Sequence, residues 1–170
     1  MNDENALYVW KLWDEAYLPS YGSEWAACFD FHASLRNGDS VTVYNEKNEK
    51  TKRPVVSNTV ALFKRERMLV PTGLIFDLNE GQSLRIHPRS GLALKSGVMI
   101  ANCEGIVDSD YVNQTFVMLY NTSLKCFEIE DGMRIAQGEI TQVHQYRMIE
   151  SDREPEEKTN RNGGFGSTGI

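Results

Sequence analysis

The stretch Ser83-Leu84-Arg85-Ile86-His87 alternates polar and apolar residues, and Phe127-Glu128-Ile129-Glu130 shows the same alternation further along the chain. A period of two is typical of a β-strand that buries one of its faces. The apolar member of each pair should therefore face a core, with Arg85 and His87 facing outward. These two stretches favour a protein built from half-buried strands.

The rest of the chain extends this pattern. Clusters of Gly, Asn and Asp divide it into short apolar segments, none of which reaches three clean helical turns. We therefore predict an all-β fold, a sandwich or jelly roll. The predicted strands cover residues 7–13, 26–33, 40–44, 55–63, 74–78, 83–87, 97–101, 114–120, 125–129 and 139–147.

The size and charge of the chain exclude several classes of protein. Its 170 residues correspond to one ordinary domain. A formal net charge of −6 disfavours sequence-independent binding to nucleic acid or to an anionic membrane. No stretch approaches the roughly 18 apolar residues that a membrane-spanning helix needs. Because the N-terminus is acidic and no signal-peptide pattern follows it, we expect a cytoplasmic protein.

The cysteines and histidines give no sign of a metal centre. Cys28, Cys103 and Cys126 show no CxxC spacing, and the three histidines show no HxxxH or HExxH spacing. We therefore expect neither a disulfide framework nor a zinc site, and we interpret the cysteines as buried free thiols.

Two segments differ from the rest in composition. Residues 36–67 carry charged patches around one apolar strand, and we interpret them as a surface hairpin with solvated charges rather than as a basic binding site. Residues 151–164 contain no large hydrophobic side chain, which predicts a flexible tether. We therefore expect a β domain over residues 1–150 and a flexible C-terminal arm over residues 151–170.

Three segments have the chemistry to bind and attack a polyphosphate. Pro88-Arg89-Ser90-Gly91 places a guanidinium, a hydroxyl and a glycine directly after a strand, where they can converge on phosphate. In the arm, glycines allow backbone N–H groups to approach an oxyanion, and Ser167 and Thr168 add hydroxyl donors. Gly105 to Tyr111 provides carboxylates suited to a general base and to water-mediated metal binding. Any one segment alone could be an ordinary turn.

Five segments of the chain, in order, resemble the five motifs of the homotrimeric dUTP pyrophosphatases, or dUTPases. The resemblance covers nearly the whole chain. It implies a distorted jelly roll, a homotrimer with shared active sites, and Mg²⁺-dependent hydrolysis of dUTP to dUMP and pyrophosphate. The matching segments are Leu18–Asp30, Pro88–Ala93, Gly105–Tyr111, Gly132–Gln137 and Gly163–Gly169.

The resemblance also implies a role for individual residues. Asp108 corresponds to the catalytic general base, and Asp30 to a carboxylate that contacts the metal through water. Tyr111 corresponds to the tyrosine beneath the deoxyribose, Asn102 to a residue that reads the uracil edge, and Phe165 to the aromatic ring that stacks on the base. The other matches are substrate-binding positions: Arg89, Ser90, Gly91, Gly105, Gln137, Arg161, Gly166, Ser167 and Thr168.

Three positions depart from the family pattern. Cys28 stands where a glycine is usual, Met133 stands where an acid is usual, and Arg161 lies one residue closer to the glycine-rich segment than the usual arginine. The resemblance also implies that the hairpin over residues 36–67 is an insertion relative to typical members of the family. Two alternatives remain open at this point. A related family deaminates dCTP, against which Asp108 and Tyr111 argue. A nucleotide-sensing protein would instead use dUTP binding to control a partner through residues 36–67.

Overall fold

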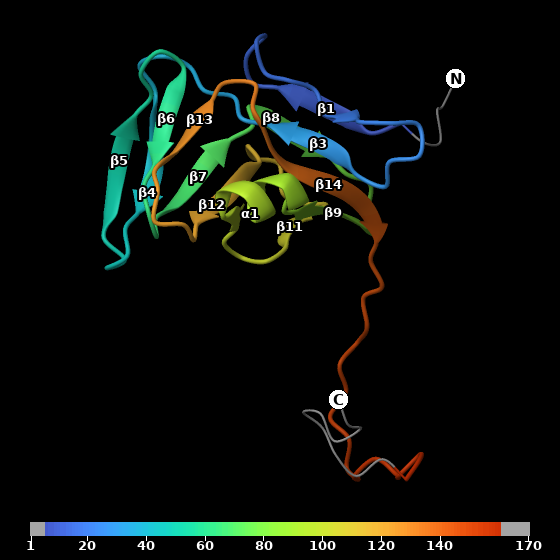
Figure 1. Cartoon of the computed structure of the whole chain (residues 1–170). Helices are drawn as coiled ribbons and strands as arrows, with labels where there is room; N and C mark the ends of the chain where they lie inside the picture. Colours follow the sequence, from blue (N-terminus) through green and yellow to red (C-terminus); the bar gives the residue numbers. More distant parts are fainter. Residues whose placement is uncertain (1–5, 161–170) are drawn as a thin grey trace.

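The computed structural model describes residues 6–160, which form short β-strands and one short helix (Figure 1). The helix is α1 (Ser90–Ser96). The strands are β1 (Tyr8–Lys11), β2 (Ser20–Tyr21), β3 (Phe29–His32), β4 (Ser40–Tyr44), β5 (Lys50–Pro54), β6 (Thr59–Leu62), β7 (Arg67–Pro71), β8 (Leu74–Asp77), β9 (Gln82–His87), β10 (Val98–Ile100), β11 (Gly105–Asp108), β12 (Phe116–Asn121), β13 (Phe127–Glu130) and β14 (Arg134–Gln142).

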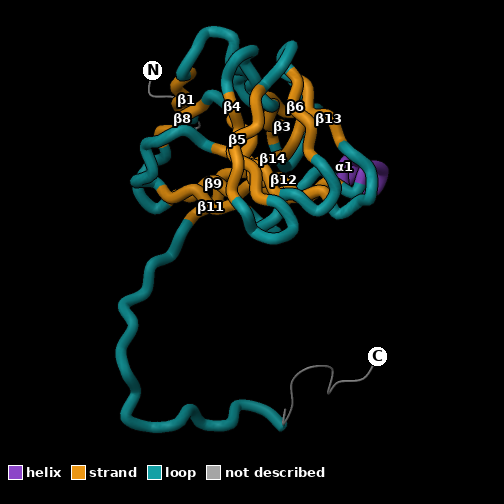
Figure 2. Tube along the Cα trace, turned by 90° about the vertical axis from the view of Figure 1, so that its left-hand side faces the viewer, coloured by secondary structure: helices purple, strands orange, loops and turns teal. Residues whose placement is uncertain are grey.

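The strands form two five-stranded sheets and two short two-stranded ones. The first large sheet has the order β10-β12-β7-β4-β5, and the second has the order β11-β9-β14-β3-β2. The short sheets are β1-β8 and β13-β6. Every pairing is antiparallel, and the body has the layered form of a jelly roll (Figure 2). The predicted all-β jelly roll is confirmed.

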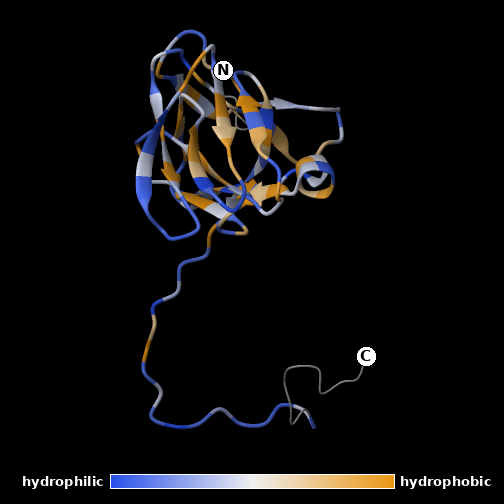
Figure 3. Cartoon of the chain, turned by 60° about the vertical axis from the view of Figure 1, so that its left-hand side comes forward, coloured by the Kyte–Doolittle hydropathy of each residue, from blue (hydrophilic) through white to orange (hydrophobic). Residues whose placement is uncertain are grey.

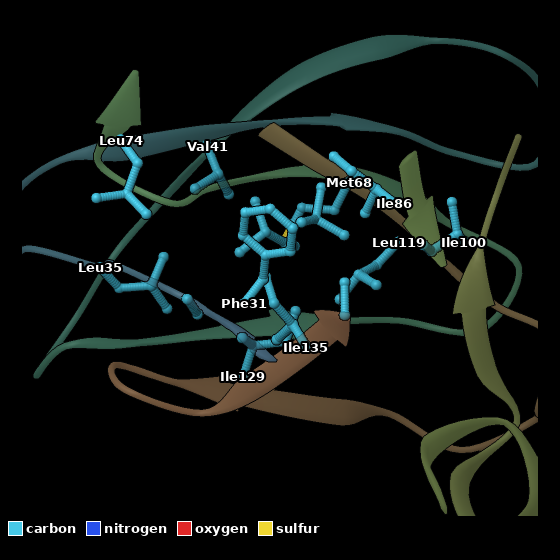
Figure 4. Close-up of a cluster of buried hydrophobic side chains, with 14 of the residues drawn as sticks. Phe31, Leu35, Val41, Met68, Leu74, Ile86, Ile100, Leu119, Ile129 and Ile135 are labelled. Carbon is cyan, nitrogen blue, oxygen red and sulfur yellow. The ribbon is translucent and has the colours of Figure 1, made fainter. Parts of the chain in front are cut away.

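The two large sheets share one hydrophobic core (Figure 4). Strands β4, β7 and β12 contribute Val43, Met68 and Leu119, each at most 1% exposed. From the other sheet, Phe31 on β3 is fully buried and lies edge-on to Phe76, with their ring centroids 5.6 Å apart. Burial of each such side chain stabilises the fold by about 1.5–3 kcal/mol.

The strands with alternating sequence bury the expected faces. On β9, Leu84 and Ile86 are 0% and 3% exposed, while Arg85 and His87 remain partly exposed on the other face. On β13, Ile129 is fully buried and the flanking glutamates are exposed. These predictions from sequence periodicity are confirmed.

Each predicted strand overlaps an observed one, but several elements were missed or misplaced. The missed elements are β2, β5, β7, β11 and α1. Strand β14 begins at Arg134 and ends at Gln142, whereas the predicted strand covered residues 139–147. Strand β5 has little apolar character, and its pairing with β4 defines it as a strand. Local patterns reveal such pairing poorly because the partner lies elsewhere in the sequence.

The interpretation of residues 36–67 as a solvated surface hairpin is wrong for most of that segment. Strand β4 lies inside its sheet, between β7 and β5. Val41, Val43, Val60 and Leu62 belong to the core and are at most 4% exposed. The exposed charged side chains lie on the edge strand β5, on the turn before it, and on the connections before β4 and between β6 and β7.

The cysteines are free thiols, but the expectation that they are buried is wrong for two of them. Cys28 is partly buried, whereas Cys103 and Cys126 are exposed. Cys103 lies in the turn between β10 and β11 with a φ of 63°, and Cys126 directly precedes β13. Both thiols therefore stand on connecting turns outside the core.

After β14 the chain leaves the body as an exposed segment without helix or strand (Figures 1 and 3). The Val143 N–H donates a hydrogen bond to the Gly81 carbonyl at 2.7 Å, close to the point where the chain departs. The described part of this segment, residues 143–160, is mostly hydrophilic (Figure 3). Among the described residues, no helix is long and apolar enough to cross a membrane.

Candidate active site

A polar cavity of about 230 Å³ lies where the β9–α1 connection approaches β3 and β14. It brings together five predicted site residues from three of the matching segments. These are Asp30, Arg89, Ser90, Gly91 and Gln137. We refer to these five residues as the basic half-site.

Within the basic half-site, the guanidinium of Arg89 is held in place by two contacts. Its Nε forms an ion pair with Asp30 Oδ1 at 3.1 Å, and its Nη1 donates a hydrogen bond to the Arg134 carbonyl at 3.0 Å. The two side chains of the ion pair are only 26% and 14% exposed, so solvent screens it less than a surface pair. The guanidinium is therefore oriented before any substrate binds, and it keeps further N–H donors for phosphate oxygens.

Asp30 joins two arginines. Its Oδ1 forms the ion pair with Arg89, and its Oδ2 accepts a hydrogen bond from Arg134 Nη1 at 3.0 Å. The carboxylate is only 14% exposed. Each oxygen retains a second lone pair that can accept a hydrogen bond from a metal-bound water. No group of three or more His, Cys, Asp or Glu side chains arranged to hold a metal occurs among the described residues. The single carboxylate of Asp30 fits a Mg²⁺ ion that is held mainly by substrate phosphates and water.

Ser90, Gly91 and Gln137 complete the cavity. Ser90 and Gly91 are the first residues of α1, so their backbone N–H groups have no acceptor within the helix. Gln137 Nε2 donates to the Pro88 carbonyl at 3.0 Å, which fixes the amide beside the same connection. Neutral donors and one oriented guanidinium therefore line the cavity beside the Asp30 carboxylate, and these donors suit an anionic group.

Two titratable side chains near the cavity contribute no charge at neutral pH. Burial lowers the pKa of His32; the Asp30 charge opposes this shift, and the Arg134 and Arg89 charges reinforce it. Burial raises the pKa of the Cys28 thiol, and the nearby charges of Glu139 and Asp30 raise it further. Since His32 and Cys28 are neutral, the charges in and around the site come from Asp30 and its two arginines, with Glu139 nearby.

A second group of predicted residues lies on β11 and its flanking turns, and we refer to it as the acidic half-site. It consists of Asn102, Gly105, Asp108 and Tyr111. Asp108 ends β11 with an exposed carboxylate that has no hydrogen bond or ion pair to any other described residue. The Tyr111 N–H donates to the Asp108 carbonyl at 3.1 Å, and its hydroxyl donates to the Gln114 carbonyl at 2.9 Å. The turn is thereby closed and the tyrosine ring held.

Asn102 and Gly105 line a small cavity of about 110 Å³ beside this turn. A Cβ atom on Gly105 would lie 3.1 Å from the Cβ of Ile86, closer than most side chains tolerate. Glycine therefore allows β11 to approach β9 closely at this position.

The two half-sites lie at opposite ends of β9. Asp108 pairs with Ser83 near the start of β9, whereas Arg89 follows its last residue, His87. Arg89 lies six positions after Ser83 along extended chain, a distance of about 20 Å. One chain therefore cannot place Asp108 and Arg89 on the same phosphate group.

The structure thus brings the predicted residues together in two groups rather than one. It also shows a residue that the sequence analysis missed, Arg134, whose only signal was its place in the fourth matching segment. The remaining predicted residues, Arg161, Phe165, Gly166, Ser167 and Thr168, lie outside the described residues.

A jelly roll with an oriented guanidinium at one end of a strand and an exposed carboxylate at the other has the parts of a nucleotide hydrolase. Comparisons with known proteins identify the family. The dUTPase family model matches residues 55–169. The deoxyuridine 5′-triphosphate nucleotidohydrolase of Rhizobium leguminosarum bv. trifolii is 40% identical over 153 residues, which cover 90% of this chain and 85% of that protein. The chain therefore belongs to the dUTPase family.

Other relatives agree with this assignment. The deoxyuridine 5′-triphosphate nucleotidohydrolase of Nautilia profundicola is 37% identical over 163 residues, covering 96% of this chain and 98% of that protein. A solved dUTPase of Staphylococcus bacteriophage 80alpha with dUpNHpp has a TM-score of 0.77 at 19% identity, covering 98% of this chain and 99% of that one. The dUTPase of Streptococcus mutans has a TM-score of 0.65 at 21% identity, covering 84% and 98%. Both solved structures share the fold of this chain.

Proposed function

We propose that this chain hydrolyses dUTP to dUMP and pyrophosphate, limiting uracil in DNA and supplying dUMP for dTMP synthesis. The observation that carries the proposal is the presence of both half-sites, with a free carboxylate in one and an oriented guanidinium in the other, in a chain of the dUTPase family. The exposed thiols of Cys103 and Cys126 fit a reducing compartment, and we place the activity in the cytoplasm.

The free carboxylate of Asp108 is suited to act as the general base. It would take a proton from the water that attacks the α-phosphorus, while the bond to the departing pyrophosphate breaks. Arg89, with the hydroxyl and N–H donors of Ser90 and Gly91, would bind the phosphates of the substrate, in the ground state and in the transition state alike. Gln137, fixed beside the same connection, would face the phosphates as well.

Mg²⁺ is the proposed cofactor, and it supplies positive charge that offsets the negative charge of the triphosphate. The described residues would contribute Asp30, through the lone pairs that its arginines leave free. Because Asp30 is a single carboxylate, it would contact the hydrated ion rather than enclose it.

The acidic half-site would also select the substrate. The ring of Tyr111 is 39% exposed and held by its hydroxyl, so it can lie beneath deoxyribose and leave no room for a ribose 2′-hydroxyl. Asn102 and Gly105, at the adjacent cavity, would read the uracil edge. A site whose polar groups pair with uracil rejects cytosine, because those groups would then be left unpaired.

We propose a homotrimer in which the basic half-site of one subunit faces the acidic half-site of another. The separation of about 20 Å along β9 supports such an arrangement, because both groups would then meet at the same phosphates. Apolar side chains surround the acidic half-site: Ile106 is 55% exposed, Phe116 41% and Met118 37%, and all three line the small cavity. A clustered, exposed apolar patch of this kind is typical of a subunit interface.

The arm over residues 151–170 would complete each site from a third subunit. Upstream of it, Tyr146, Met148 and Ile149 are between 73% and 87% exposed, which suits a segment that packs against a neighbouring chain. Phe165 would stack on the base. The remaining arm residues, Arg161, Gly166, Ser167 and Thr168, would contact the phosphates.

Pyrophosphate release from each common nucleotide tests the proposal. The purified chain should act on dUTP far faster than on UTP, dCTP or dTTP, and chelation of Mg²⁺ should suppress the activity. Absence of pyrophosphate release from dUTP with Mg²⁺ would overturn the proposed function. Release of ammonia from dCTP would point instead to a deaminase.

A further inference from the structure

Arg134 contacts both partners of the ion pair that orients the basic half-site. Its guanidinium Nη1 donates to Asp30 Oδ2 at 3.0 Å, and its backbone carbonyl accepts from Arg89 Nη1 at 3.0 Å. Asp30, Arg89 and Arg134 therefore form a closed ring of contacts. Arg134 itself does not line the cavity that Asp30 and Arg89 line.

A β-bulge at the start of β14 places Arg134 in this ring. Gln137 pairs with Asp30 and Arg134 pairs with His32, with a register shift between Arg134 and Ala136. Residues three apart on a regular strand point to opposite faces of the sheet. Because β14 holds one extra residue here, Arg134 and Gln137 both lie on the face of Asp30.

The core accommodates the bulge. Ile135 and Ala136 are adjacent in sequence, yet they are 1% and 0% exposed, so both side chains point inward. Two consecutive buried residues break the alternation of β14 at the one place where it runs beside the basic half-site. Bulges beside active sites commonly re-aim a side chain in this way.

The Asp30–Arg134 ion pair contributes little to the stability of the fold. The Arg134 side chain is 52% exposed, and ion pairs with so exposed a partner contribute little to stability because water screens them. The effect of this ion pair on the positions of the side chains in the half-site is larger than its effect on stability. Without Arg134, Asp30 would lose one of the two contacts that fix its carboxylate, and Arg89 would depend on a less constrained partner.

We propose that Arg134 is a positioning residue for the phosphate-binding guanidinium of Arg89, acting through Asp30. The inference rests on the proposed function, since it concerns the same phosphate site. In this role Arg134 does not contact the substrate. Replacement of Arg134 should therefore act through Asp30 and weaken the binding of phosphate groups, without slowing the attack by water.

The first test compares Arg134→Gln with Arg134→Lys. Arg134→Gln should raise KM for dUTP about tenfold and leave kcat within about threefold, because it weakens ground-state and transition-state binding equally. Arg134→Lys should recover most of the loss, since one N–H donor is enough to reach Asp30 Oδ2. Lys47→Gln, which removes an exposed positive charge from the turn between β4 and β5, should change neither constant. An unchanged KM in Arg134→Gln would overturn the proposal.

The second test asks whether Arg134 acts through Asp30. Binding of inorganic pyrophosphate with Mg²⁺ is measured by calorimetry in Asp30→Asn, Arg134→Gln and the double variant. The double variant should bind pyrophosphate at most about twofold more weakly than Asp30→Asn alone, since the effects of residues that act as a unit are non-additive. A further tenfold loss of pyrophosphate affinity in the double variant would show that Arg134 contacts the phosphates directly, contrary to the proposal. Because this titration needs no turnover, its result is independent of whether the chain hydrolyses dUTP.

Discussion

Asp108 faces Ser83 across the β11–β9 pair, at the end of β9 remote from Arg89. The carboxylate stands at the tip of a short strand, is exposed, and has no side-chain partner among the described residues. A change in its charge should therefore leave the core and the strand pairing intact. Effects of such a change on turnover can then be assigned to the chemistry.

Replacement of Asp108 by asparagine should lower turnover of dUTP by roughly a hundredfold or more. The amide keeps the size of the side chain but cannot accept the proton of the attacking water. Pyrophosphate release measures turnover, and calorimetry should show that nucleotide still binds. Asp110→Asn, two residues along the same turn, is the matched control and should have a much smaller effect. Turnover near that of the unmodified chain would remove Asp108 from its assigned role.

Removal of the Tyr111 ring should relax discrimination against ribose. In Tyr111→Ala the ratio of kcat/KM for UTP to that for dUTP should rise by about tenfold, because the space beneath the sugar opens. Tyr111→Phe keeps the ring and loses only the hydrogen bond to the Gln114 carbonyl, so its ratio should stay within about threefold of the unmodified chain. If both variants still reject UTP as well as the parent does, another residue excludes the 2′-hydroxyl.

The fold could be predicted to the extent that local patterns determine it. Alternation on β9 and β13 gave the buried faces of Leu84 and Ile129 correctly. Strand β5 could not be found in this way, because its Lys and Arg residues resemble a turn and its pairing partner β4 is a separate segment. The burial of β4 and β6 was missed for a related reason, since the charges around these strands masked their valines and leucines.

The candidate site was predictable as residue types but not as an arrangement. The resemblance to the dUTPase motifs selected Asp30, Arg89 and Asp108, yet it did not show that β9 separates the last two. The contribution of Arg134 depends on a register shift between β14 and β3. A bulge of this kind is a property of two paired strands. The spacing within β14 alone would therefore predict that Arg134 lies on the face opposite to Asp30.

The ion pair of Glu66 with Arg53 should make stability depend on pH. Arg53 Nη2 donates to Glu66 Oε1 at 2.8 Å, Arg53 Nη1 donates to Oε2, and the Phe63 N–H donates to Oε2 at 2.9 Å. Burial alone would raise the pKa of Glu66, but these hydrogen bonds and the Arg53 charge outweigh it and hold the pKa below its ordinary value of 4.5. The stabilisation is therefore present above that value and is lost as pH falls through the lower, folded-state pKa.

Glu66→Gln should accordingly destabilise the chain by about 2 kcal/mol at pH 7, and the difference from the parent should shrink at pH 3. Urea denaturation of the variant and the parent at both pH values, at one fixed protein concentration, measures this difference in the free energy of unfolding. Glu128→Gln, on the exposed face of β13, should stay within about 0.5 kcal/mol of the parent at both. A difference for Glu66→Gln that is equally large at pH 3 would mean that its charge does not supply the stabilisation.

Deletion of residues 161–170 should separate activity from folding. The deletion leaves every buried hydrophobic side chain of residues 6–160 in place, so the melting temperature and the subunit assembly should change little. Turnover of dUTP should fall steeply, because the deletion removes Phe165 and the Ser167 and Thr168 donors that would close each site and exclude water. Thermal melting, size-exclusion chromatography and pyrophosphate release test these three expectations. Full turnover by the truncated chain would show that the arm is not part of the site.

Mixed assemblies of two inactive chains test whether the site is shared. The chain lacking residues 161–170 keeps Asp108, and full-length Asp108→Ala keeps the arm. The separation of Asp108 from Arg89 along β9 supports a site built from more than one subunit. If a site takes its carboxylate from one subunit and its arm from another, subunit exchange should restore part of the lost turnover. Mass spectrometry of the native assemblies confirms the exchange. A control mixture in which both chains carry Asp108→Ala should stay inactive. Mixed trimers with no activity after confirmed exchange would rule out the shared site.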